Sequence, residues 1–299
     1  MAAITCARTL VQAGHRVTLM EKSHTVGGRM STRNSPFGSF DHGAQYFTVR
    51  DPRFALALQT TPKTCKPWSA NTVRVLDERG MVAAAGLPAR EAHWVPSPGM
   101  SALVKEWAKP LAAHIELQTR VTHIEPDALN PHQWQLRTVG SNDSTHVYSG
   151  FDAVVLAIPS PQAQALLATC KKGAALAKKI GKVEVAPCWT LMLAFPQAMQ
   201  PDMWTLGPQW NAARSTHHRV AWLARESSKP GRGKIERWTV RAVPAHVDTQ
   251  RWLYAKTTRP LGTSHVWDAK AGLGLCGDWC LGHRVEDAFV SGLELALAL

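Results

Sequence analysis

The sequence has few acidic residues, few tyrosines and no long hydrophobic run. It contains 22 Asp and Glu against 34 Lys and Arg, which gives a formal net charge of +12, and only 3 tyrosines among 299 residues. The longest nearly uncharged apolar stretch, residues 185–195, includes Pro187, and it is too short to cross a bilayer. The first residues show no basic segment followed by a cleavage site of small residues. We therefore expect a cytoplasmic protein with no secretion signal and no membrane partner.

Cysteine is also scarce. Only Cys276 and Cys280 stand close together among the 6 cysteines, and no neighbouring Cys or His pair completes a zinc-binding set. Reduced thiols are the expected state in a chain of this length without a signal peptide. We therefore expect no metal site and no disulfide framework.

Much of the positive charge lies in one segment. Five lysines occupy a predicted helix, and spacings of seven and four residues place Lys171, Lys178 and Lys182 on one face. One interpretation is a solvated helix face. The other is a positive surface that attracts an anionic substrate or contacts nucleic acid. Aromatic residues do not interleave with these lysines, which argues against nucleic acid as a partner.

The apolar pattern predicts helices that alternate with short buried strands. Helices are expected at 2–13, 101–113, 160–182 and 285–299, and strands at 17–20, 115–124, 153–158 and 273–276. A strand-rich part is expected at 187–226 and 237–254, with hairpins at 72–85 and 133–148 and an exposed loop at 227–233. This order predicts an α/β protein, in which a doubly wound Rossmann-like domain is interleaved with an α+β domain.

An acidic residue ends the first predicted strand. Glu21 stands 18 positions after Ala3. In nucleotide-binding βαβ units, an acid about 20 residues beyond the glycine turn accepts the ribose hydroxyls. A carboxylate suits vicinal hydroxyls because it accepts two hydrogen bonds in one plane. The alternative is a strand-ending Glu that is simply solvated.

A pair of glycines with an arginine follows this acid. Gly27 and Gly28 let the backbone approach a bulky anion, and the Arg29 guanidinium can bind a diphosphate through paired hydrogen bonds. A turn with no ligand is the alternative.

A second turn of this kind lies near the C-terminus. Gly277 and Asp278 stand between an apolar strand and a helix that begins near Val285. The free N–H groups of that helix, with Arg284 beside them, would stabilise a developing anion. Glu286 and Asp287 have the alternative role of complementing the helix dipole.

Eight segments together resemble one family. They are VTLMEKSHTVGGRMSTR (17–33), FDHGAQYFT (40–48), VPSPGMSALV (95–104), RVTHIE (120–125), DAVVLAIPSPQA (152–163), WLARESSKPGR (222–232), RWLYA (251–255) and GLCGDWCLGHRVEDAFVSGLELA (274–296). In this order they resemble the flavin-dependent amine oxidase superfamily and, within it, the small renalase-like oxidoreductases. The resemblance implies an FAD-binding domain at 1–50, 95–158 and 265–299, and a substrate domain at 51–94 and 159–264.

The resemblance also implies roles for individual residues. The adenosine and diphosphate part of FAD would contact Ala3, Glu21, Lys22, Gly28, Arg29 and Val121. The ribityl chain and flavin ring would contact Gly43, Ala44, Gln45, Gly277, Asp278, Arg284 and Val285. The substrate would be lined by Tyr46, Trp252 and Tyr254, for which core packing is the alternative. The catalytic residues stay unknown; His42 is the one candidate acid or base, and we expect it to be structural.

The sequence departs from the family at its start. Members open with a buried strand and the fingerprint G-x-G-x-x-G/A, of which only Ala3, at the last position, has a counterpart here. That strand lies in the middle of a parallel sheet and is buried on both faces. Its absence would therefore destabilise the sheet and remove half of the diphosphate-binding loop. We expect either that the true start lies upstream or that the gene is degraded.

The resemblance implies an FAD-dependent oxidoreductase that takes hydride from a small reduced substrate, with O2 as the acceptor and peroxide as the product. Renalase-like members act on aberrant isomers of reduced NAD(P), so a reduced dinucleotide is the first expected substrate. Such a transfer needs little side-chain help, because the nicotinamide regains aromaticity and positioning does most of the work. The alternatives are a flavin amine oxidase, and a truncated, flavin-free remnant that acts at most as a binding protein.

Overall fold

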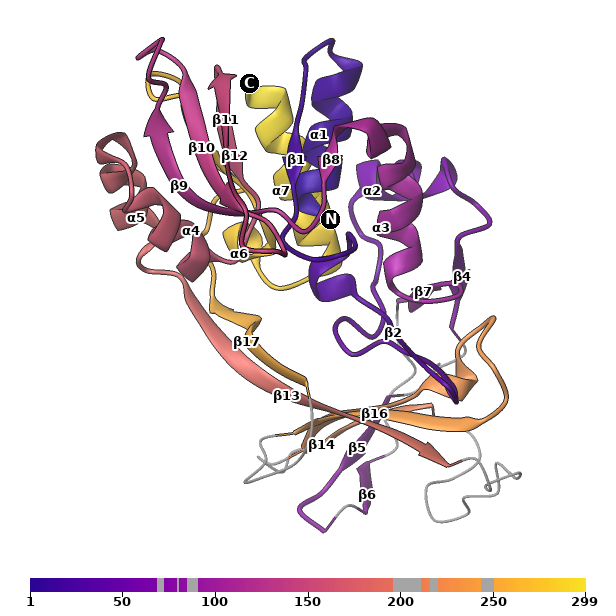
Figure 1. Cartoon of the computed structure of the whole chain (residues 1–299). Helices are drawn as coiled ribbons and strands as arrows, with labels where there is room; N and C mark the ends of the chain where they lie inside the picture. The colour runs from indigo at the N-terminus through magenta and orange to yellow at the C-terminus, as the bar shows by residue number, and fades with distance from the viewer. Residues whose placement is uncertain (69–72, 80, 85–90, 196–210, 216–219, 243–249) are drawn as a thin grey trace. The chain divides into compact units, whose positions relative to one another are not determined.

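The computed structural model describes residues 1–68, 73–79, 81–84, 91–195, 211–215, 220–242 and 250–299 (Figure 1). The chain divides into two compact units, each assembled from separate stretches. The first comprises Met1–Gly27, Trp107–Val185 and Lys256–Leu299, and the second comprises Gly28–Glu106 and Ala186–Ala255. These bounds differ from the predicted domains, since 28–50 and 95–106 belong to the second unit and 159–185 and 256–264 to the first. The predicted division of cofactor and substrate binding stays a prediction.

The first unit contains three small sheets. Strands β1 (Leu19–Met20) and β8 (Ile115–Glu116) pair in parallel. Strand β19 (Leu273–Leu275) pairs in parallel with β12 (Val154–Leu156) and antiparallel with β18 (Val266–Asp268). The third sheet is an antiparallel meander of β9 (Arg120–Pro126), β10 (Trp134–Val139) and β11 (Thr145–Phe151).

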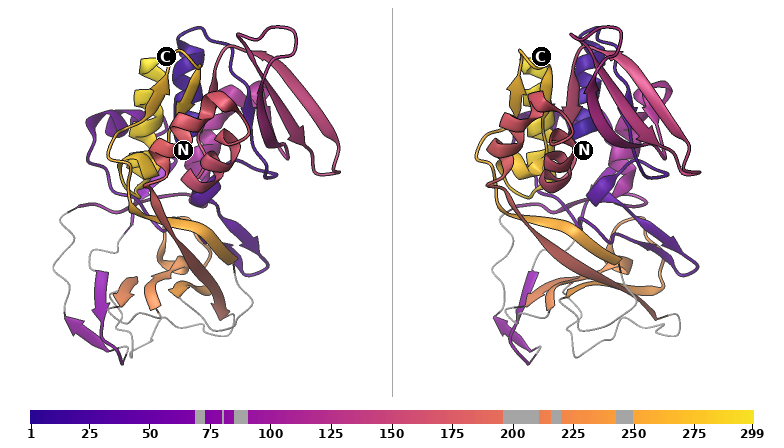
Figure 2. Two further views of the ribbon diagram at one scale, coloured as in Figure 1. Left: turned by 90° about the vertical axis from the view of Figure 1, so that its left-hand side faces the viewer. Right: turned by 60° about the vertical axis from the view of Figure 1, so that its left-hand side comes forward.

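Helices pack on these sheets. They are α1 (Ala2–Gln12), α4 (Ser160–Leu167), α5 (Ala174–Ile180), α6 (Asp278–Leu281) and α7 (Val285–Ala298), with 3-10 turns η2 (Lys109–His114) and η3 (Lys171–Gly173). Helices α1 and α7 lie side by side (Figure 2). A Cβ at Gly292 would collide with the carbonyl oxygen of Ala2, so glycine permits this close approach. Among the described residues, no helix combines the length and the apolar character needed to cross a membrane.

The second unit is built on a seven-stranded sheet with the order β17-β13-β16-β15-β14-β5-β6. Its strands are β5 (Val73–Leu76), β6 (Val82–Ala84), β13 (Glu184–Phe195), β14 (Ala212–Ser215), β15 (Val220–Arg225), β16 (Glu236–Ala242) and β17 (Gln250–Arg259). Two small antiparallel pairs join β2 (Arg33–Ser35) to β3 (Gly38–Phe40), and β4 (Cys65–Pro67) to β7 (Trp94–Pro96). The helical segments are η1 (Gly28–Met30), α2 (Pro52–Gln59), α3 (Ser101–Ala108, which ends in the first unit) and η4 (Glu226–Ser228).

Most predicted elements are confirmed, including the helices at both ends and both hairpins. Four predictions need correction. The single helix expected at 160–182 is divided into α4, η3 and α5, because the chain turns back at 168–173 so that both helices pack on the same core. The strand expected at 17–20 is only two residues long and half-buried, and the helix expected at 101–113 changes to a 3-10 turn at Lys109, next to Pro110. The strand expected at 115–124 is broken at Gln118, whose φ is 54°. The parts of the strand-rich prediction over 196–210, with Trp204 and Trp210, over 216–219 and over 243–249 lie outside the described residues.

The expected exposed loop at 227–233 is the clearest error. It is a turn of the chain, as predicted, but the Lys229 side chain is fully buried. The reason is that acceptors from distant segments surround its ammonium group, as described below.

Candidate functional site

Glu21 is the residue that ends β1 in the first unit. Its backbone continues the pairing with β8, because its N–H donates to the Glu116 carbonyl at 2.9 Å and its own carbonyl accepts from Thr119 at 2.9 Å. One carboxylate oxygen accepts the Ser23 N–H at 2.8 Å. The side chain is half-buried and Lys22 beside it is exposed. A carboxylate held in this way at the end of a parallel strand can accept hydroxyl groups from a bound nucleotide.

Helix α1 begins in the same unit without a side-chain cap and with no acidic residue in its first turn. The first N–H groups of a helix, including that of Ala3, have no acceptor within the helix. They also form the positive end of its dipole. The start of α1 therefore offers donors to an anion.

Val121 occupies a different kind of position. It lies in β9, opposite Thr138 of β10, and packs half-buried against the main core cluster of the first unit. Its side chain thus contributes to the core, and only its backbone is left for the predicted adenine contact.

The C-terminal residues group around α6 and α7. The Gly277 N–H donates to the Ser291 hydroxyl at 2.9 Å, and a Cβ at Gly277 would collide with the Trp279 indole. Asp278 is buried as the first residue of α6. The Arg284 N–H donates to the Asp287 carboxylate at 2.9 Å, so Asp287 caps the start of α7. Val285 is the first residue of α7, and its N–H has no acceptor within that helix.

The second unit brings Arg29 and the turn at 43–44 together. The Ala44 N–H donates to the Arg29 carbonyl at 2.8 Å, and a Cβ at Gly43 would collide with the same carbonyl oxygen. Gly28 has a φ of 53°, in the left-handed region that favours glycine. These positions thus form one backbone corner.

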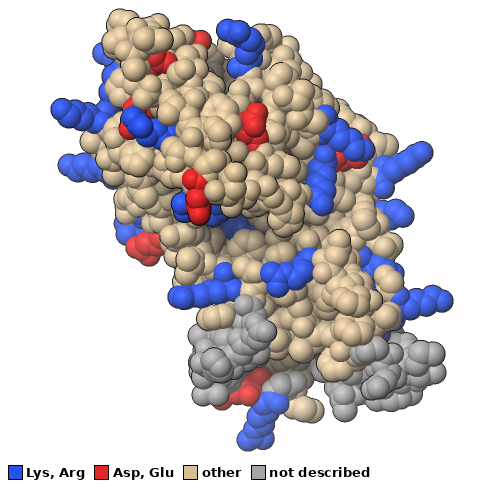
Figure 3. Space-filling model, in the orientation of Figure 1, with Lys and Arg blue, Asp and Glu red and all other residues tan. Residues whose placement is uncertain are grey.

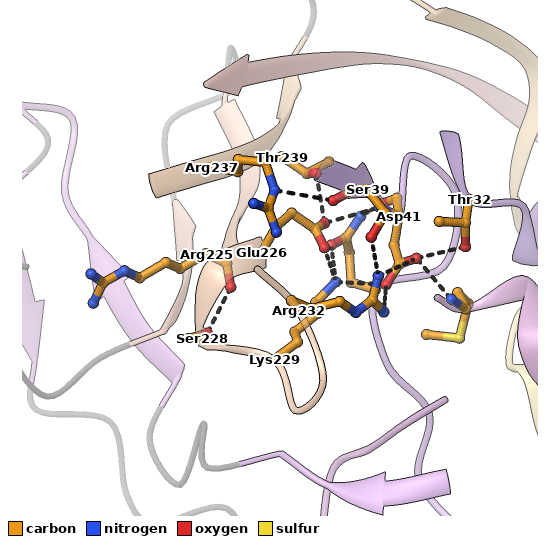
Figure 4. Close-up of polar contacts among 12 residues, drawn as sticks. Thr32, Ser39, Asp41, Arg225, Glu226, Ser228, Lys229, Arg232, Arg237 and Thr239 are labelled. Atoms are coloured by element: carbon orange, nitrogen blue, oxygen red, sulfur yellow. Dashed lines mark hydrogen bonds and ion pairs between the residues drawn. The ribbon is translucent and has the colours of Figure 1, made fainter. Parts of the chain in front are cut away.

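Gln45 connects this corner to a buried ion cluster, defined here as Asp41, Glu226, Lys229 and Arg232 (Figure 4). Its side-chain amide donates to the carbonyl of Asp41 and, at 3.4 Å, to that of Gly43. Its amide oxygen accepts from the Lys229 ammonium at 3.0 Å. The Lys229 ammonium also lies 3.1 Å from the Asp41 carboxylate and 3.0 Å from that of Glu226.

Asp41 is the most heavily bonded member of the cluster. Its carboxylate lies 2.6 Å from the Arg232 guanidinium and accepts the Thr32 hydroxyl and the Met100 N–H, both at 2.8 Å. Burial alone would raise the pKa of Asp41, but Lys229 and Arg232 together bring it below its ordinary value. Glu226 accepts the Thr239 hydroxyl at 2.7 Å, and burial raises its pKa despite Lys229. Asp41 is therefore the ionised centre of the cluster.

The predicted substrate residues also lie in the second unit. Tyr46 contacts the rings of His93, Trp222 and Trp68, with centroids 4.2, 5.6 and 6.2 Å away. Trp252 donates its indole N–H to the His42 carbonyl at 3.0 Å and stacks on the His42 ring at 5.4 Å. Tyr254 is two residues further along β17, so it shares a face of that strand with Trp252. The structure thus places Tyr46 in one aromatic group and Trp252 in another.

His42 is buried, and its Nε2 lies 3.1 Å from the Ser31 hydroxyl. Burial, with a smaller contribution from Arg33, lowers the pKa of His42 to about 4. Its imidazole is therefore neutral at pH 7. Its contacts to Ser31 and Trp252 fit the structural role expected for it.

Sequence reasoning missed the ion cluster and the aromatic partners Trp68, His93 and Trp222. The only available signal was that the cluster's residues fall in family-like segments, Asp41 in 40–48 and the other three in 222–232. Within the described ranges, no three His, Cys, Asp or Glu side chains converge as metal ligands do, and the absence of a metal site stays a prediction.

The five lysines of the basic segment are exposed on η3, α5 and the residues that follow. Over the face shown in Figure 3, Lys and Arg side chains stand at many separate places. Both interpretations of this segment stay open.

Comparison with known families identifies two parts of the chain. Residues 1–58 match the NAD(P)-binding Rossmann-like domain. Residues 85–221 match the flavin containing amine oxidoreductases. By these two matches the chain is similar to the flavin amine oxidase-like oxidoreductases. The predicted α/β fold class is thereby confirmed, and residues 85–221 match the predicted superfamily.

Solved structures agree with this fold. Putrescine oxidase with bound putrescine superposes with a TM-score of 0.69 at 8% identity, covering 99% of this chain and 96% of that chain. An oxidoreductase from Methanosarcina mazei gives 0.65 at 11% identity, covering 100% and 98%. At these identities the likeness concerns the fold alone.

Several described residues have features that suit a flavin cofactor. The first unit provides an uncapped helix start free of acids in its first turn and a carboxylate at the end of β1. The second unit provides a glycine with positive φ before Arg29 and a glycine corner on the Arg29 carbonyl. Each of these features suits a bulky anionic ligand that needs close backbone approach.

Proposed function

We propose that this flavin amine oxidase-like oxidoreductase binds FAD and takes hydride from a small reduced substrate, with O2 as the acceptor. The observation that carries the proposal is Glu21, a carboxylate fixed by Ser23 at the end of a parallel strand that follows the uncapped helix α1. The amine oxidase match supports a flavin as the cofactor. FAD is the form with an adenosine ribose for Glu21 to bind.

The first unit would hold the dinucleotide part. Glu21, with Lys22 beside it, would accept the ribose hydroxyls, and the start of α1 around Ala3 would donate to the diphosphate. Val121 would contact the adenine through its backbone. Asp278, after Gly277, would bind the ribityl region, and Val285, next to Arg284, would donate its N–H to the pyrimidine side of the ring.

The second unit would hold the reactive part. Gly28 and Arg29 would contact the diphosphate, and Gly43, Ala44 and Gln45 would lie against the flavin ring. When bound, the flavin supplies the hydride-accepting atom. The chain's own task is to orient the substrate, for which we propose Tyr46, Trp252 and Tyr254. The low pKa of His42, a result of burial and Arg33, argues against proton transfer by this residue at neutral pH.

The substrate class that we favour is an isomer of reduced NAD(P), because the ordered motifs resemble the renalase-like group. An amine is the second candidate, and the match of residues 85–221 to amine oxidoreductases favours it. The purified chain should first show a flavin absorption spectrum, or acquire one on titration with FAD. Anaerobic mixing with reduced dinucleotide isomers and, separately, with putrescine should then bleach the flavin with only one class.

Each result has a consequence. Bleaching by dinucleotide isomers supports the renalase-like substrate, and bleaching by putrescine alone replaces it with an amine. Failure to bind FAD at micromolar concentration would refute the proposed function and support the flavin-free binding protein. Peroxide formation on admitting air tests O2 as the acceptor.

A further inference from the structure

The buried ion cluster lies next to the residues proposed for the flavin ring. We propose that Lys229 is a positioning residue of the flavin site, which acts through Gln45 to hold the turn at 41–45. The inference rests on the proposed function, since its value for the enzyme depends on the flavin ring meeting this turn. The contacts themselves are independent of any ligand.

Lys229 is held by three polar partners. Its ammonium donates to Asp41 at 3.1 Å and to Gln45 at 3.0 Å, and it forms an ion pair with the Glu226 carboxylate at 3.0 Å. The side chain is fully buried, and its ammonium also lies 5.5 Å from the Trp68 ring centroid. Water therefore cannot replace a lost partner without entering the core.

This arrangement fixes the orientation of the Gln45 amide. Because Lys229 can only donate, it must face the amide oxygen of Gln45. The amide nitrogen then faces the carbonyls of Asp41 and Gly43, to which it donates. The Gln45 side chain thus bonds back to the backbone of its own turn, 41–45. Lys229 ensures that the amide nitrogen, and not the oxygen, faces these backbone carbonyls.

The turn at 41–45 also includes the backbone corner in which Ala44 bonds to the Arg29 carbonyl. The Ala44 N–H reaches the Arg29 carbonyl at 2.8 Å, and Gly43 sits so close to that carbonyl that a side chain would not fit. A displaced Gln45 would loosen this corner. Lys229, 184 residues away from Gln45 in sequence, therefore influences the position of Gly43, Ala44 and Tyr46.

Arg232 provides a matched comparison. It is a buried cation on the same carboxylate, Asp41, but its other bonds go to the Ser39 hydroxyl at 3.1 Å and the Pro96 carbonyl at 3.2 Å. Loss of Arg232 perturbs the cluster without removing the donor to Gln45. Two double variants allow the comparison. The Lys229→Met pair combines Glu226→Gln with Lys229→Met, and the Arg232→Met pair combines Glu226→Gln with Arg232→Met. Each removes one buried anion and one buried cation.

The first measurement is hydrogen exchange of the Ala44 amide in the full chain without added flavin. We expect exchange at least about tenfold faster in the Lys229→Met pair than in the Arg232→Met pair, corresponding to about 1.4 kcal/mol. The Phe47 amide, which donates to the Trp94 carbonyl at 3.0 Å, serves as the internal reference. Equal protection of Ala44 in the two pairs overturns the proposal.

The second measurement uses FAD titrated into the same proteins. We expect the Lys229→Met pair to shift the visible absorption band and the reduction potential of the bound flavin, and the Arg232→Met pair to leave both near wild type. If Lys229 had only a structural role, both pairs would change the absorption band and the reduction potential of the flavin alike. That result also overturns the proposal. If wild type takes up no FAD, the proposed function fails, while the exchange of Ala44 still decides the link from Lys229 to Gln45.

A third variant covers the case in which the paired substitutions do not fold. Gln45→Met keeps every ion pair of the cluster and removes only the amide. We expect it to speed Ala44 exchange as the Lys229→Met pair does. Wild-type protection of Ala44 in Gln45→Met overturns the proposal.

Discussion

The two units, each taken by itself, offer different kinds of candidate flavin contacts. In the first unit the candidate contacts include backbone N–H groups at the start of α1 and the half-buried carboxylate of Glu21, which is bonded only two residues away to Ser23. In the second unit the candidate contacts rest on fully buried charges, Asp41 and Lys229, that are 188 residues apart in sequence. The candidate contacts of the first unit, called the first region below, thus depend on backbone groups and on residues close together in sequence. Those of the second unit, the second region, depend on the packing of side chains far apart in sequence.

This contrast predicts different responses to substitution. Removing the Glu21 carboxylate should affect ligand binding and leave folding unchanged, because this half-buried group is bonded locally, to the Ser23 N–H. Removing a side chain from the second region should affect folding first, because an ion left alone in the interior keeps its desolvation cost. The experiments below test this division, starting with the largest effect.

Asp41→Asn should give the largest loss of stability. The amide keeps the shape of the side chain but removes the charge of the carboxylate that both Lys229 and Arg232 contact. We expect the free energy of unfolding to fall by about 3–5 kcal/mol, the usual cost of breaking a buried pair. Urea denaturation followed by circular dichroism measures it.

Glu184→Gln is the matched control for Asp41→Asn. Glu184 pairs with Arg259 at 3.2 Å, but both side chains are more than half exposed. We expect a change within about 0.5 kcal/mol, as for most surface pairs. A loss below about 1 kcal/mol for Asp41→Asn would mean that the cluster is not needed for folding.

His42 should make the second region sensitive to acid. Its pKa in the folded protein is lowered from 6.5 to about 4 by burial and by Arg33, so between these values the unfolded chain binds the proton more readily. The contribution of His42 to stability is complete above pH 6.5 and is lost as the pH falls to 4. We expect a loss of about 3 kcal/mol over this range.

Comparison with His42→Gln isolates this contribution from other titrating groups. Unfolding free energies of the two proteins should converge as the pH falls from 7 to 4, since the variant lacks the histidine proton. Parallel curves would show that His42 is protonated as easily in the folded protein as in the unfolded chain.

The success of the sequence analysis follows the same division. The helices at 2–12 and 285–298 and the acid at the end of β1 were predictable because apolar spacing and a short distance along the chain determine them. The shortened β1 and the break at Gln118 were not, since strand limits depend on pairing partners.

Lys229 shows why the ion cluster escaped prediction. Its segment, 227–233, contains Ser, Lys, Pro, Gly and Arg, the composition of a solvated loop. The segment is indeed a turn, but the acceptors Asp41 and Gln45 come from 188 and 184 residues away. No local pattern encodes such a contact. The one signal in the sequence was the family resemblance, which includes both the segment with Asp41 and Gln45 (40–48) and the segment with Lys229 (222–232).

Glu21→Gln tests the first region. A carboxylate bonded to ribose hydroxyls contributes about 1.5–3 kcal/mol as a charged acceptor, so we expect the Kd for FAD to rise about 10- to 100-fold in fluorescence titrations. The free energy of unfolding should stay within about 0.5 kcal/mol. Glu116→Gln, at the end of the neighbouring strand β8 and exposed, is the control and should bind FAD as wild type does. Equal affinity in Glu21→Gln and Glu116→Gln would remove the ribose role.

Arg29→Met should give the smallest effect, and it separates two roles of one residue, because the backbone and the side chain of Arg29 have different proposed functions. Its backbone carbonyl holds the Ala44 N–H and is unchanged by the substitution, whereas the proposed diphosphate contact uses its half-exposed guanidinium. We therefore expect stability within about 0.5 kcal/mol of wild type and an FAD affinity about tenfold lower. Arg33→Met, whose guanidinium bonds to Gln250 at the surface at 2.6 Å, should keep the wild-type affinity. If Arg29→Met instead unfolds more easily and binds FAD normally, the guanidinium serves the packing of the second unit and the diphosphate contact must come from the backbone alone.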